Sequence, residues 1–276
     1  MKSLTLSLII PVYNEERHLK ACLDAIAAQT ERPDEVIVVD NNSSDRSVEI
    51  AKSYAFVRVA HEPKQGVVFA RDRGFDEAKS TIIGRIDADS IVSPGWVHYV
   101  KRFYGTEQHT DHALTGAGYF YNMRLPKING WIQSQLAYRT NRFVLGHYIT
   151  WGSNMAILRE HWLKARPYVC HRDDIHEDLD LAIHLHRLGY KISYRSGLIV
   201  GVYLSRVYDK KDDRRQYMAR WPTTLKVHGN KLWWMGVVGN IILILLIQIF
   251  ILIELLSKLF DSSTNLESPS NSDTHR

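Results

Sequence analysis

Apolar and polar positions alternate in short blocks along the first third of the chain, and each block has the length of one strand or one helix. Four runs rich in β-branched residues predict strands at 4–10, 35–39, 57–60 and 81–86, and Pro11 is expected to end the first. After the first run, apolar residues recur at the spacing of one helix face, at Leu19, Cys22, Leu23, Ile26 and Ala27. Strands that alternate with helices predict an α/β fold with a mainly parallel sheet.

The second half of the chain predicts fewer elements. A strand is expected at 113–120, and residues 150–157 predict another. The segment 127–148 is rich in aromatic and basic residues, so it could lie on a membrane surface, line an acceptor groove or form an ordinary amphipathic helix. A further helix is expected to open near His176 and to close at Gly189, because glycine commonly follows the last helical residue.

Two carboxylates, Asp87 and Asp89, follow the fourth apolar run directly. If the strand continued through them, both side chains would point the same way and could reach one hard divalent cation. Mg²⁺ or Mn²⁺ suits such a site, since these ions use one or two carboxylates and complete their shell with water and phosphate oxygens. A solvated turn is the alternative, because Asp-Ala-Asp-Ser is also good turn composition. Asp40 ends another predicted strand, and parallel sheets bind ligands at that edge.

Size and charge narrow the function classes. The chain has 276 residues, enough for one large α/β core or two modest ones, and a formal charge of +5 suits anionic partners such as phosphorylated substrates or lipid surfaces. No basic block with interleaved aromatic residues argues for nucleic acid. The two cysteines, Cys22 and Cys170, lie far apart in the sequence and favour a reducing compartment. The first apolar run is too short and too alternating for a signal peptide.

Four segments, in order, resemble the motifs of the family 2 glycosyltransferases, which have the GT-A fold: SLIIPVYNEE at 7–16, VVDNNSSD at 38–45, ARDRG at 70–74 and DADS at 87–90. The resemblance implies a nucleotide-sugar donor, a metal held by Asp87 and Asp89, and transfer with inversion of the anomeric carbon. The donor-binding residues that it implies are Pro11, Tyr13, Glu15, Asp40, Asn42, Arg71, Asp87, Ala88 and Asp89. Asp72 departs from the family pattern, which commonly has asparagine there.

Acidic residues open the predicted helix near residue 177. A Glu-Asp pair at a helix start looks like the catalytic-base motif of the same family, which implies Asp178 as the base beside Glu177, with Asp180 as the second choice. Inversion by direct displacement requires one carboxylate to take the proton of the acceptor hydroxyl. The helix dipole also favours acidic residues in a first turn, so capping explains part of the pattern. No ligand spacing supports a zinc site at the nearby histidines His176, His184 and His186.

Two further segments resemble acceptor or diphosphate motifs of the family. The first, at 150–157, implies Trp151, Gly152 and Asn154 near the sugar, although a plain core strand would also explain it. The second resembles the Q-x-x-R-W motif of processive relatives and contains Gln216, Arg220 and Trp221. Its spacing is off by one residue, so we expect no processive polymerisation.

Residues 232–253 contain no Asp, Glu, Lys or Arg. A helix of that length spans about 33 Å, enough for the hydrocarbon core of a bilayer. Basic residues before it place the preceding chain in the cytoplasm by the positive-inside rule. The predicted organisation is a catalytic domain over 1–225, a juxtamembrane and transmembrane segment over 226–256, and a disordered tail over 257–276.

The sequence therefore predicts an inverting, Mg²⁺- or Mn²⁺-dependent glycosyltransferase, anchored by a single membrane pass. The expected partners are a nucleotide-sugar donor, a lipid-linked or glycan acceptor and the membrane, with no nucleic acid and the oligomeric state open. Two alternatives stay open: a nucleotidyltransferase on a similar fold, for which no lysine-rich triphosphate loop is found, and a membrane-anchored sugar-binding protein without catalysis.

Overall fold

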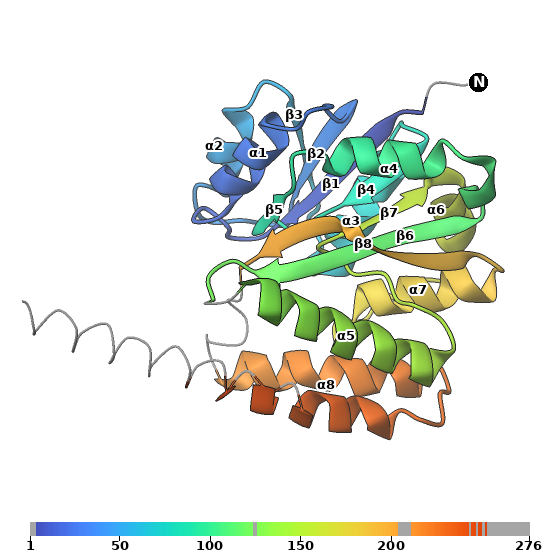
Figure 1. Ribbon diagram of the computed structural model, residues 1–276. Helices are drawn as coiled ribbons and strands as arrows, with labels where there is room; N and C mark the ends of the chain where they lie inside the picture. Colours follow the sequence, from blue (N-terminus) through green and yellow to red (C-terminus); the bar gives the residue numbers. More distant parts are fainter. Residues whose placement is uncertain are drawn as a thin grey trace, which may run out of the picture.

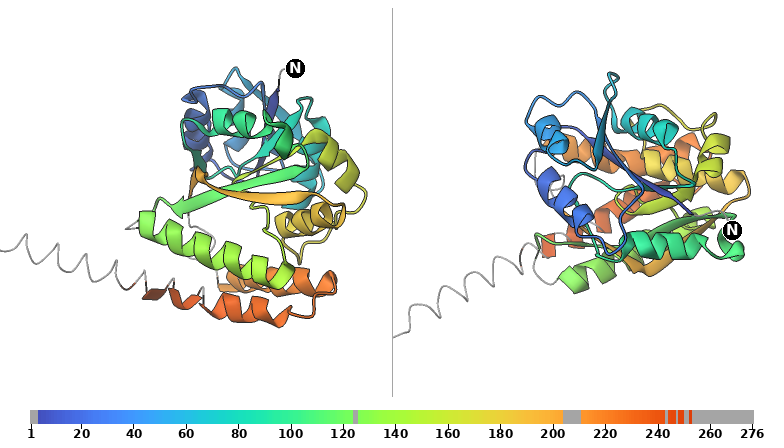
Figure 2. Two further views of the ribbon diagram at one scale, coloured as in Figure 1. Left: turned by 45° about the vertical axis from the view of Figure 1, so that its right-hand side comes forward. Right: turned by 90° about the horizontal axis from the view of Figure 1, so that it is seen from above.

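The computed structural model describes residues 4–123, 126–203, 211–242, 244–246, 248, 249 and 252. Within these residues the chain forms a single mixed sheet in the order β3-β2-β1-β4-β7-β6-β8-β5 (Figure 1). Helices cover both faces of the sheet, and the predicted α/β class is confirmed. A third group of helices lies beyond the sheet, at the bottom of Figure 1 and of the left view in Figure 2.

The first half of the chain is the parallel part of the sheet. Its strands are β1 (Leu6–Val12), β2 (Glu35–Asp40), β3 (Val57–His61) and β4 (Ile82–Arg85). Its helices are α1 (Leu19–Ala27), α2 (Ser47–Lys52) and α3 (Val67–Glu77). The expectation that Pro11 ends the first strand was wrong, because β1 continues to Val12. Pairing of β1 with β4 stops at Ile9, so the missing N–H of Pro11 breaks no hydrogen bond to that neighbour.

The second half adds antiparallel strands and extends the sheet on the other side of β4. Strand β7 (Met155–Leu158) pairs with both β4 and β6 (His112–Phe120), β8 (Lys191–Val202) lies parallel to β6, and β5 (Ser90–Val92) closes the edge. The helices are α4 (Trp96–Tyr104), a short 3₁₀ turn (Glu107–His109), α6 (Arg159–Ala165) and α7 (Glu177–Arg187). The sequence did not predict β5, β8, α4 or α6.

Alternation along the buried strands divides the core between the two faces of the sheet. On β1, Leu8 and Ile10 pack with α1, α2 and α4, whereas Ile9 packs on the opposite face with α3, α6 and α7. Close approach of α3 to β1 depends on Gly74, since a Cβ there would lie 2.2 Å from Ile9. Both faces of the sheet are therefore covered by apolar side chains, as expected for strands whose sequences are continuous apolar runs.

The third group of helices consists of α5 (Pro126–Leu145), α8 (Lys211–Val227) and a helical segment over 234–242. The views in Figures 1 and 2 place these three side by side. Contacts join them: Trp221 donates a hydrogen bond to Asn141 at 3.0 Å, and Asn230 donates one to the carbonyl of Val144 at 3.0 Å. The layer packs against α7, where Leu179 and Ile183 contact Val144 of α5 and Leu225 of α8 in one apolar cluster.

Among the residues that the structure describes, no helix combines the length and the apolarity that a membrane crossing requires. The predicted span over 232–253 is described only in part, since 243, 247, 250, 251 and 253 lie outside the described residues, as does the predicted tail over 257–276. Several described side chains of the span are exposed, including Trp234 at 50% and Ile241 at 54%.

Candidate functional site

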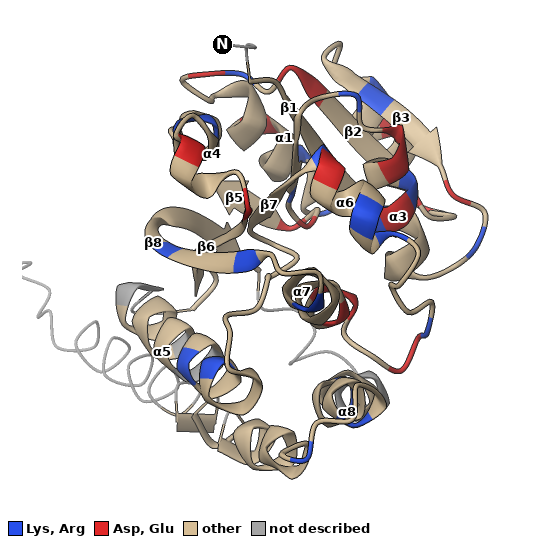
Figure 3. Ribbon diagram, turned by 90° about the vertical axis from the view of Figure 1, so that its right-hand side faces the viewer, with Lys and Arg blue, Asp and Glu red and all other residues tan. Residues whose placement is uncertain are grey.

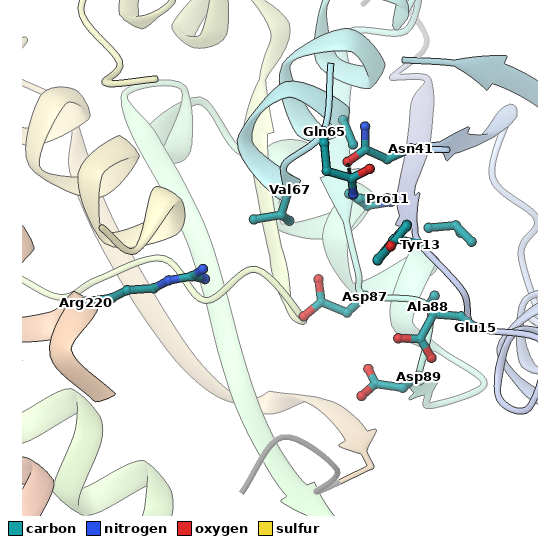
Figure 4. Close-up of a pocket in the computed structure, with 12 residues that line it drawn as sticks. Pro11, Tyr13, Glu15, Asn41, Gln65, Val67, Asp87, Ala88, Asp89 and Arg220 are labelled. Atoms are coloured by element: carbon teal, nitrogen blue, oxygen red, sulfur yellow. Dashed lines mark hydrogen bonds between the residues drawn. The ribbon is translucent and has the colours of Figure 1, made fainter. Parts of the chain in front are cut away.

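A pocket opens at the carboxyl ends of β1 and β4, where parallel sheets commonly bind ligands. Three carboxylates, Glu15, Asp87 and Asp89, lie together on one side, and Arg220 reaches in from α8 opposite Asp87 (Figure 4). The remaining lining residues are Pro11, Val12, Tyr13, Asn41, Gln65, Val67, Ala70 and Ala88. Segments from both halves of the chain therefore meet at this pocket.

Asp87 and Asp89 lie in the turn between β4 and β5, and the expectation that the strand continues through them was wrong. The backbone N–H of Ser90 donates to the carbonyl of Asp87 at 3.0 Å, which closes the turn. Turn composition and a ligand site are not exclusive here, because the turn itself presents both carboxylates to the pocket.

Arg85 fixes the orientation of the Asp87 side chain through an ion pair. Its guanidinium is buried and forms ion pairs with both Asp87, at 3.1 Å, and Glu177. Burial alone would lower the pKa of Arg85, but the two carboxylates raise it, so the cation is permanent. Burial alone would likewise raise the pKa of Glu177, but Arg85 and Arg71 lower it to about 2. Glu177 is thus a buried ion-pair partner of Arg85.

Asp178 is held close to Asp87 through two consecutive residues. The backbone N–H of Gly152 donates to Asp178 Oδ2 at 2.9 Å, and the hydroxyl of Ser153 donates to Asp87 Oδ2 at 2.5 Å. Gly152 must be glycine, since a Cβ there would lie 2.7 Å from the guanidinium of Arg85. Burial and the neighbouring Glu177 raise the pKa of Asp178 above that of an ordinary aspartate. A carboxylate with a raised pKa is better suited to accept a proton.

Most of the residues expected at the donor site do line the pocket, namely Pro11, Tyr13, Glu15, Asp87, Ala88 and Asp89. Asp40 does not, because its Oδ1 accepts the N–H of Ser43 at 3.0 Å and its Oδ2 faces His61 at 3.2 Å. Asn42 is exposed, has a φ of 67° and donates to the carbonyl of Pro63.

The expected contact of Arg71 with a diphosphate is not supported by the geometry. Its side chain is completely buried, pairs with Asp72 and donates to the carbonyl of Glu177 at 2.7 Å. Asp72 also contacts His171 at 2.8 Å. The aspartate that departs from the family pattern therefore holds Arg71 under the start of α7, away from the pocket.

The acceptor-side expectations divide in the same way. Arg220 lines the pocket, whereas Trp221 faces α5. Asn154 is completely buried and joins three elements, since its Nδ2 donates to the carbonyls of Ala117 and Leu198 and its Oδ1 accepts from Trp96. A direct contact of Asn154 with substrate is therefore corrected to a structural role.

The remaining acceptor and base candidates do not line the pocket, and neither do Gly152, Glu177 and Asp178 described above. Trp151 is half-buried, Gln216 is exposed on α8, and neither is a lining residue. Asp180 is completely buried one turn along α7, and its carboxylate is bound by His228 and by the backbone N–H of Cys170. It does not line the pocket either.

Sequence reasoning missed several lining residues and one organising residue. Asn41, Gln65, Val67 and Ala70 line the pocket, and Asn41 accepts the backbone N–H of Gly66 at 2.7 Å, which shapes the loop before α3. A signal was available for Asn41, which directly follows the expected Asp40. Arg85 gave a weaker signal: a charged residue inside an apolar strand, two positions before a carboxylate, needs buried partners.

Comparison with known proteins identifies the family of this chain. Residues 7–162, more than half of the chain, match the model of glycosyl transferase family 2. The chain belongs to this family. In sequence it is 40% identical over 91 residues to an uncharacterized glycosyltransferase, EpsJ, from Bacillus subtilis (strain 168). That match covers 32% of this chain and 26% of EpsJ, so the chain corresponds to about a quarter of this relative's length.

Solved structures show that the GT-A-like fold extends beyond the family match. The mannosyltransferase PcManGT from Pyrobaculum calidifontis, in complex with GDP-Man and Mn²⁺, superimposes with a TM-score of 0.64 at 18% identity, over 81% of this chain and 63% of that one. TarS 1–349 from S. aureus, in complex with UDP-GlcNAc, gives a TM-score of 0.54 at 17% identity, over 80% of this chain and 66% of that one. Most of this family 2 chain therefore has the GT-A-like arrangement of these structures.

Proposed function

We propose that this glycosyltransferase binds a nucleotide-diphosphate sugar with a divalent metal and transfers the sugar with inversion. One observation carries the proposal: Asp87 lines the pocket, and Gly152 and Ser153 connect it to the carboxylate of Asp178. The chain therefore holds a candidate donor site and a candidate base at fixed separation, as a direct displacement requires.

The donor set fits a hard cation. Glu15, Asp87 and Asp89 supply only carboxylate oxygens to the pocket, and such ligands suit Mg²⁺ or Mn²⁺. Asp87 and Asp89 would hold the metal, which supplies charge neutralisation for the leaving diphosphate. The structure of PcManGT with GDP-Man and Mn²⁺ supports the same metal class. Arg220, on the opposite side of the pocket, adds a second positive charge toward a diphosphate.

Asp178 would act on the acceptor. Its Oδ1 accepts the N–H of Leu179 at 2.8 Å and its Oδ2 accepts that of Gly152, so the side chain has one fixed orientation. From that position it would take the proton of the acceptor hydroxyl as the hydroxyl oxygen attacks the anomeric carbon. Glu177 would not take that proton, because Arg85 keeps it paired.

The acceptor would be lipid-linked or otherwise close to a membrane. Three large apolar side chains of α5 are exposed, Ile128 at 48%, Trp131 at 65% and Phe143 at 71%, and at about 100° per residue they share one face of the helix. The same helix contains basic residues and no acidic one (Figure 3). Exposed aromatic residues beside basic ones suit an anionic bilayer surface. A cytoplasmic catalytic domain with a single-pass anchor over 232–253 would complete this arrangement.

The test is a screen of purified full-length protein with UDP- and GDP-sugars in Mn²⁺, with and without vesicles that contain polyprenyl-phosphate-linked sugar. We expect donor hydrolysis or transfer with one donor class, and NMR of the first-formed product should show the inverted anomer. Binding of a nucleotide sugar without any turnover would instead support the sugar-binding alternative. Retention of the anomeric configuration would overturn the single-displacement mechanism.

A further inference from the structure

A second cluster of metal-binding side chains lies outside the pocket, on the side of α7 that faces α8. It contains Cys170, from the loop before α7, Asp180 and His184, one turn apart on α7, and His228, just after α8. One donor atom from each residue lies within 4.8 Å of all the others. Asp180 is completely buried, and the side chains of His184 and His228 are 12% and 5% exposed.

The distances approach those of a tetrahedral zinc site. Zinc bonds of about 2.0–2.3 Å place neighbouring ligand atoms about 3.4–3.6 Å apart. The Nε2 of His184 lies 3.4 Å from Asp180 Oδ1 and 4.0 Å from Cys170 Sγ, and the Nε2 of His228 lies 2.8 Å from the same Asp180 oxygen. Since the four donor atoms lie within 4.8 Å of one another, the cluster would reach zinc geometry by shifts of up to roughly one ångström.

All four side chains of the cluster meet at Asp180. Its carboxylate accepts from His228 and, on its other oxygen, from the backbone N–H of Cys170. The thiol of Cys170 also interacts with this carboxylate and lies 4.0 Å from Nε2 of His184, so it points at the same centre. A thiol, two imidazoles and a carboxylate around one point form the mixed sulfur and nitrogen set that zinc prefers.

We propose that Cys170, Asp180, His184 and His228 bind a structural Zn²⁺ ion. The backbone N–H of Cys170 would fix the second oxygen of Asp180, as outer hydrogen bonds commonly do for ligating carboxylates. Binding would release the thiol proton of Cys170 to solvent, and the proton that His228 donates from Nε2 to Asp180 would move to Nδ1. Arg187, whose Nη1 now lies 3.2 Å from that Nδ1, would keep only its bond to the carbonyl of His228.

The ion would join three segments that are far apart in the sequence, the loop before α7, α7 itself and the end of α8. Figure 3 shows α7 and α8 next to each other. The site is separate from the pocket, because none of its four residues lines the pocket. It also offers sulfur and nitrogen beside one carboxylate, whereas Glu15, Asp87 and Asp89 offer only oxygen. It would fix α8, and with it Arg220, against the helix that carries Asp178.

Metal content of the purified full-length chain tests the proposal. After growth with zinc and dialysis against buffer, elemental analysis should find about one zinc per chain, and a competition titration should show affinity weakened by about 10- to 100-fold or more in Cys170→Ser and in His228→Ala. His186→Ala removes a histidine of the same helix outside the cluster and should keep the zinc. Circular dichroism checks that each variant is folded.

Substitution with Co²⁺ gives a readout that does not depend on any variant. In the wild-type chain, bound cobalt should show a thiolate-to-metal charge-transfer band, because Cys170 would be a ligand. Absence of zinc together with absence of that band would overturn the proposal, as would equal zinc binding in wild type, Cys170→Ser and His228→Ala. Neither result would affect the proposed transferase activity, which depends on Mg²⁺ or Mn²⁺ at Asp87 and Asp89.

Discussion

Glu177 and Arg85 form an ion pair inside the protein, between the start of α7 and the last residue of β4. The side chains are 10% and 3% exposed, so each charge depends on the other for compensation. Arg85 also contacts Asp87, and therefore this pair links the helix that carries Asp178 to the turn that carries Asp87 and Asp89.

Glu177→Gln should destabilise the fold by about 3–5 kcal/mol at neutral pH, because it leaves Arg85 buried with only part of its compensation. The pKa of Glu177 is lowered to about 2, so its contribution is complete above the unfolded value of about 4.3 and is lost as pH falls toward 2. Urea unfolding from pH 7 to pH 3 measures this. Glu49→Gln, at an exposed position on α2, is the control and should change stability little. A gap between wild type and Glu177→Gln that does not narrow in acid would contradict the assignment.

Asp89→Asn should abolish metal-dependent donor binding and leave the fold intact, since it removes ligand charge at almost constant volume. Calorimetry with a nucleoside diphosphate and Mn²⁺ measures the affinity. Asp24→Asn changes an exposed carboxylate on α1 that pairs with Lys20, one turn away, and it should bind as wild type. Unchanged affinity in Asp89→Asn would remove this residue from the metal site.

Asp178→Asn should keep donor affinity and lower turnover by roughly 10²- to 10⁴-fold, the usual cost of losing a general base. Asp180→Asn should lose much less turnover, because Asp180 is completely buried and bound by His228, whereas Asp178 is only partly buried. Single-turnover kinetics with saturating donor separate the two effects. If Asp180→Asn were the inactive variant, the base assignment would move to Asp180.

Gly152→Ala should lower turnover strongly, since its Cβ would lie 2.7 Å from the Arg85 guanidinium and would displace the backbone that binds Asp178. Gly95→Ala is a matched control, because a Cβ there meets nothing within 4 Å. Measurement of kcat and donor affinity in both variants shows whether the function of Asp178 depends on this backbone contact. Full activity in Gly152→Ala would show that the base does not depend on this backbone contact.

Trp131→Glu should weaken binding to vesicles that contain anionic lipid, because it places a charge on the exposed apolar face of α5. Tyr168→Glu changes another exposed aromatic residue, on the loop after α6, and should bind as wild type. Co-sedimentation over a range of lipid concentrations measures both. Equal loss in the two variants would show that α5 is not the contact surface.

Local pattern predicted the parallel half of the sheet well, because residues such as Val36 and Val38 belong to strands buried on both faces. It did not predict β8, whose exposed polar positions and register shift opposite Gly116 hide the strand period. The sequence pattern also misplaced one site residue by a single position. Asp40 was expected in the pocket, yet its neighbour Asn41 lines it, since side-chain direction alternates along an extended chain.

Long-range partners could not be predicted at all. Spacing within α7 placed Asp180 and His184 on one face, but nothing in the sequence brings Cys170 or His228 to them. Arg85 likewise has a buried partner, Glu177, that is 92 positions away in the sequence. Such pairs depend on how loops return to the sheet, which periodicity does not encode.

The contact between Trp221 and the helical segment over 234–242 has a mechanical consequence. A Cβ on Gly239 would lie 2.5 Å from the Trp221 ring, so the segment and α8 touch without any gap. The preceding residue, Arg220, reaches the pocket. If the segment belongs to the proposed membrane anchor, any force that tilts it would be passed over one peptide unit to a cation in the pocket, and the catalytic rate would then respond to bilayer thickness and lateral pressure.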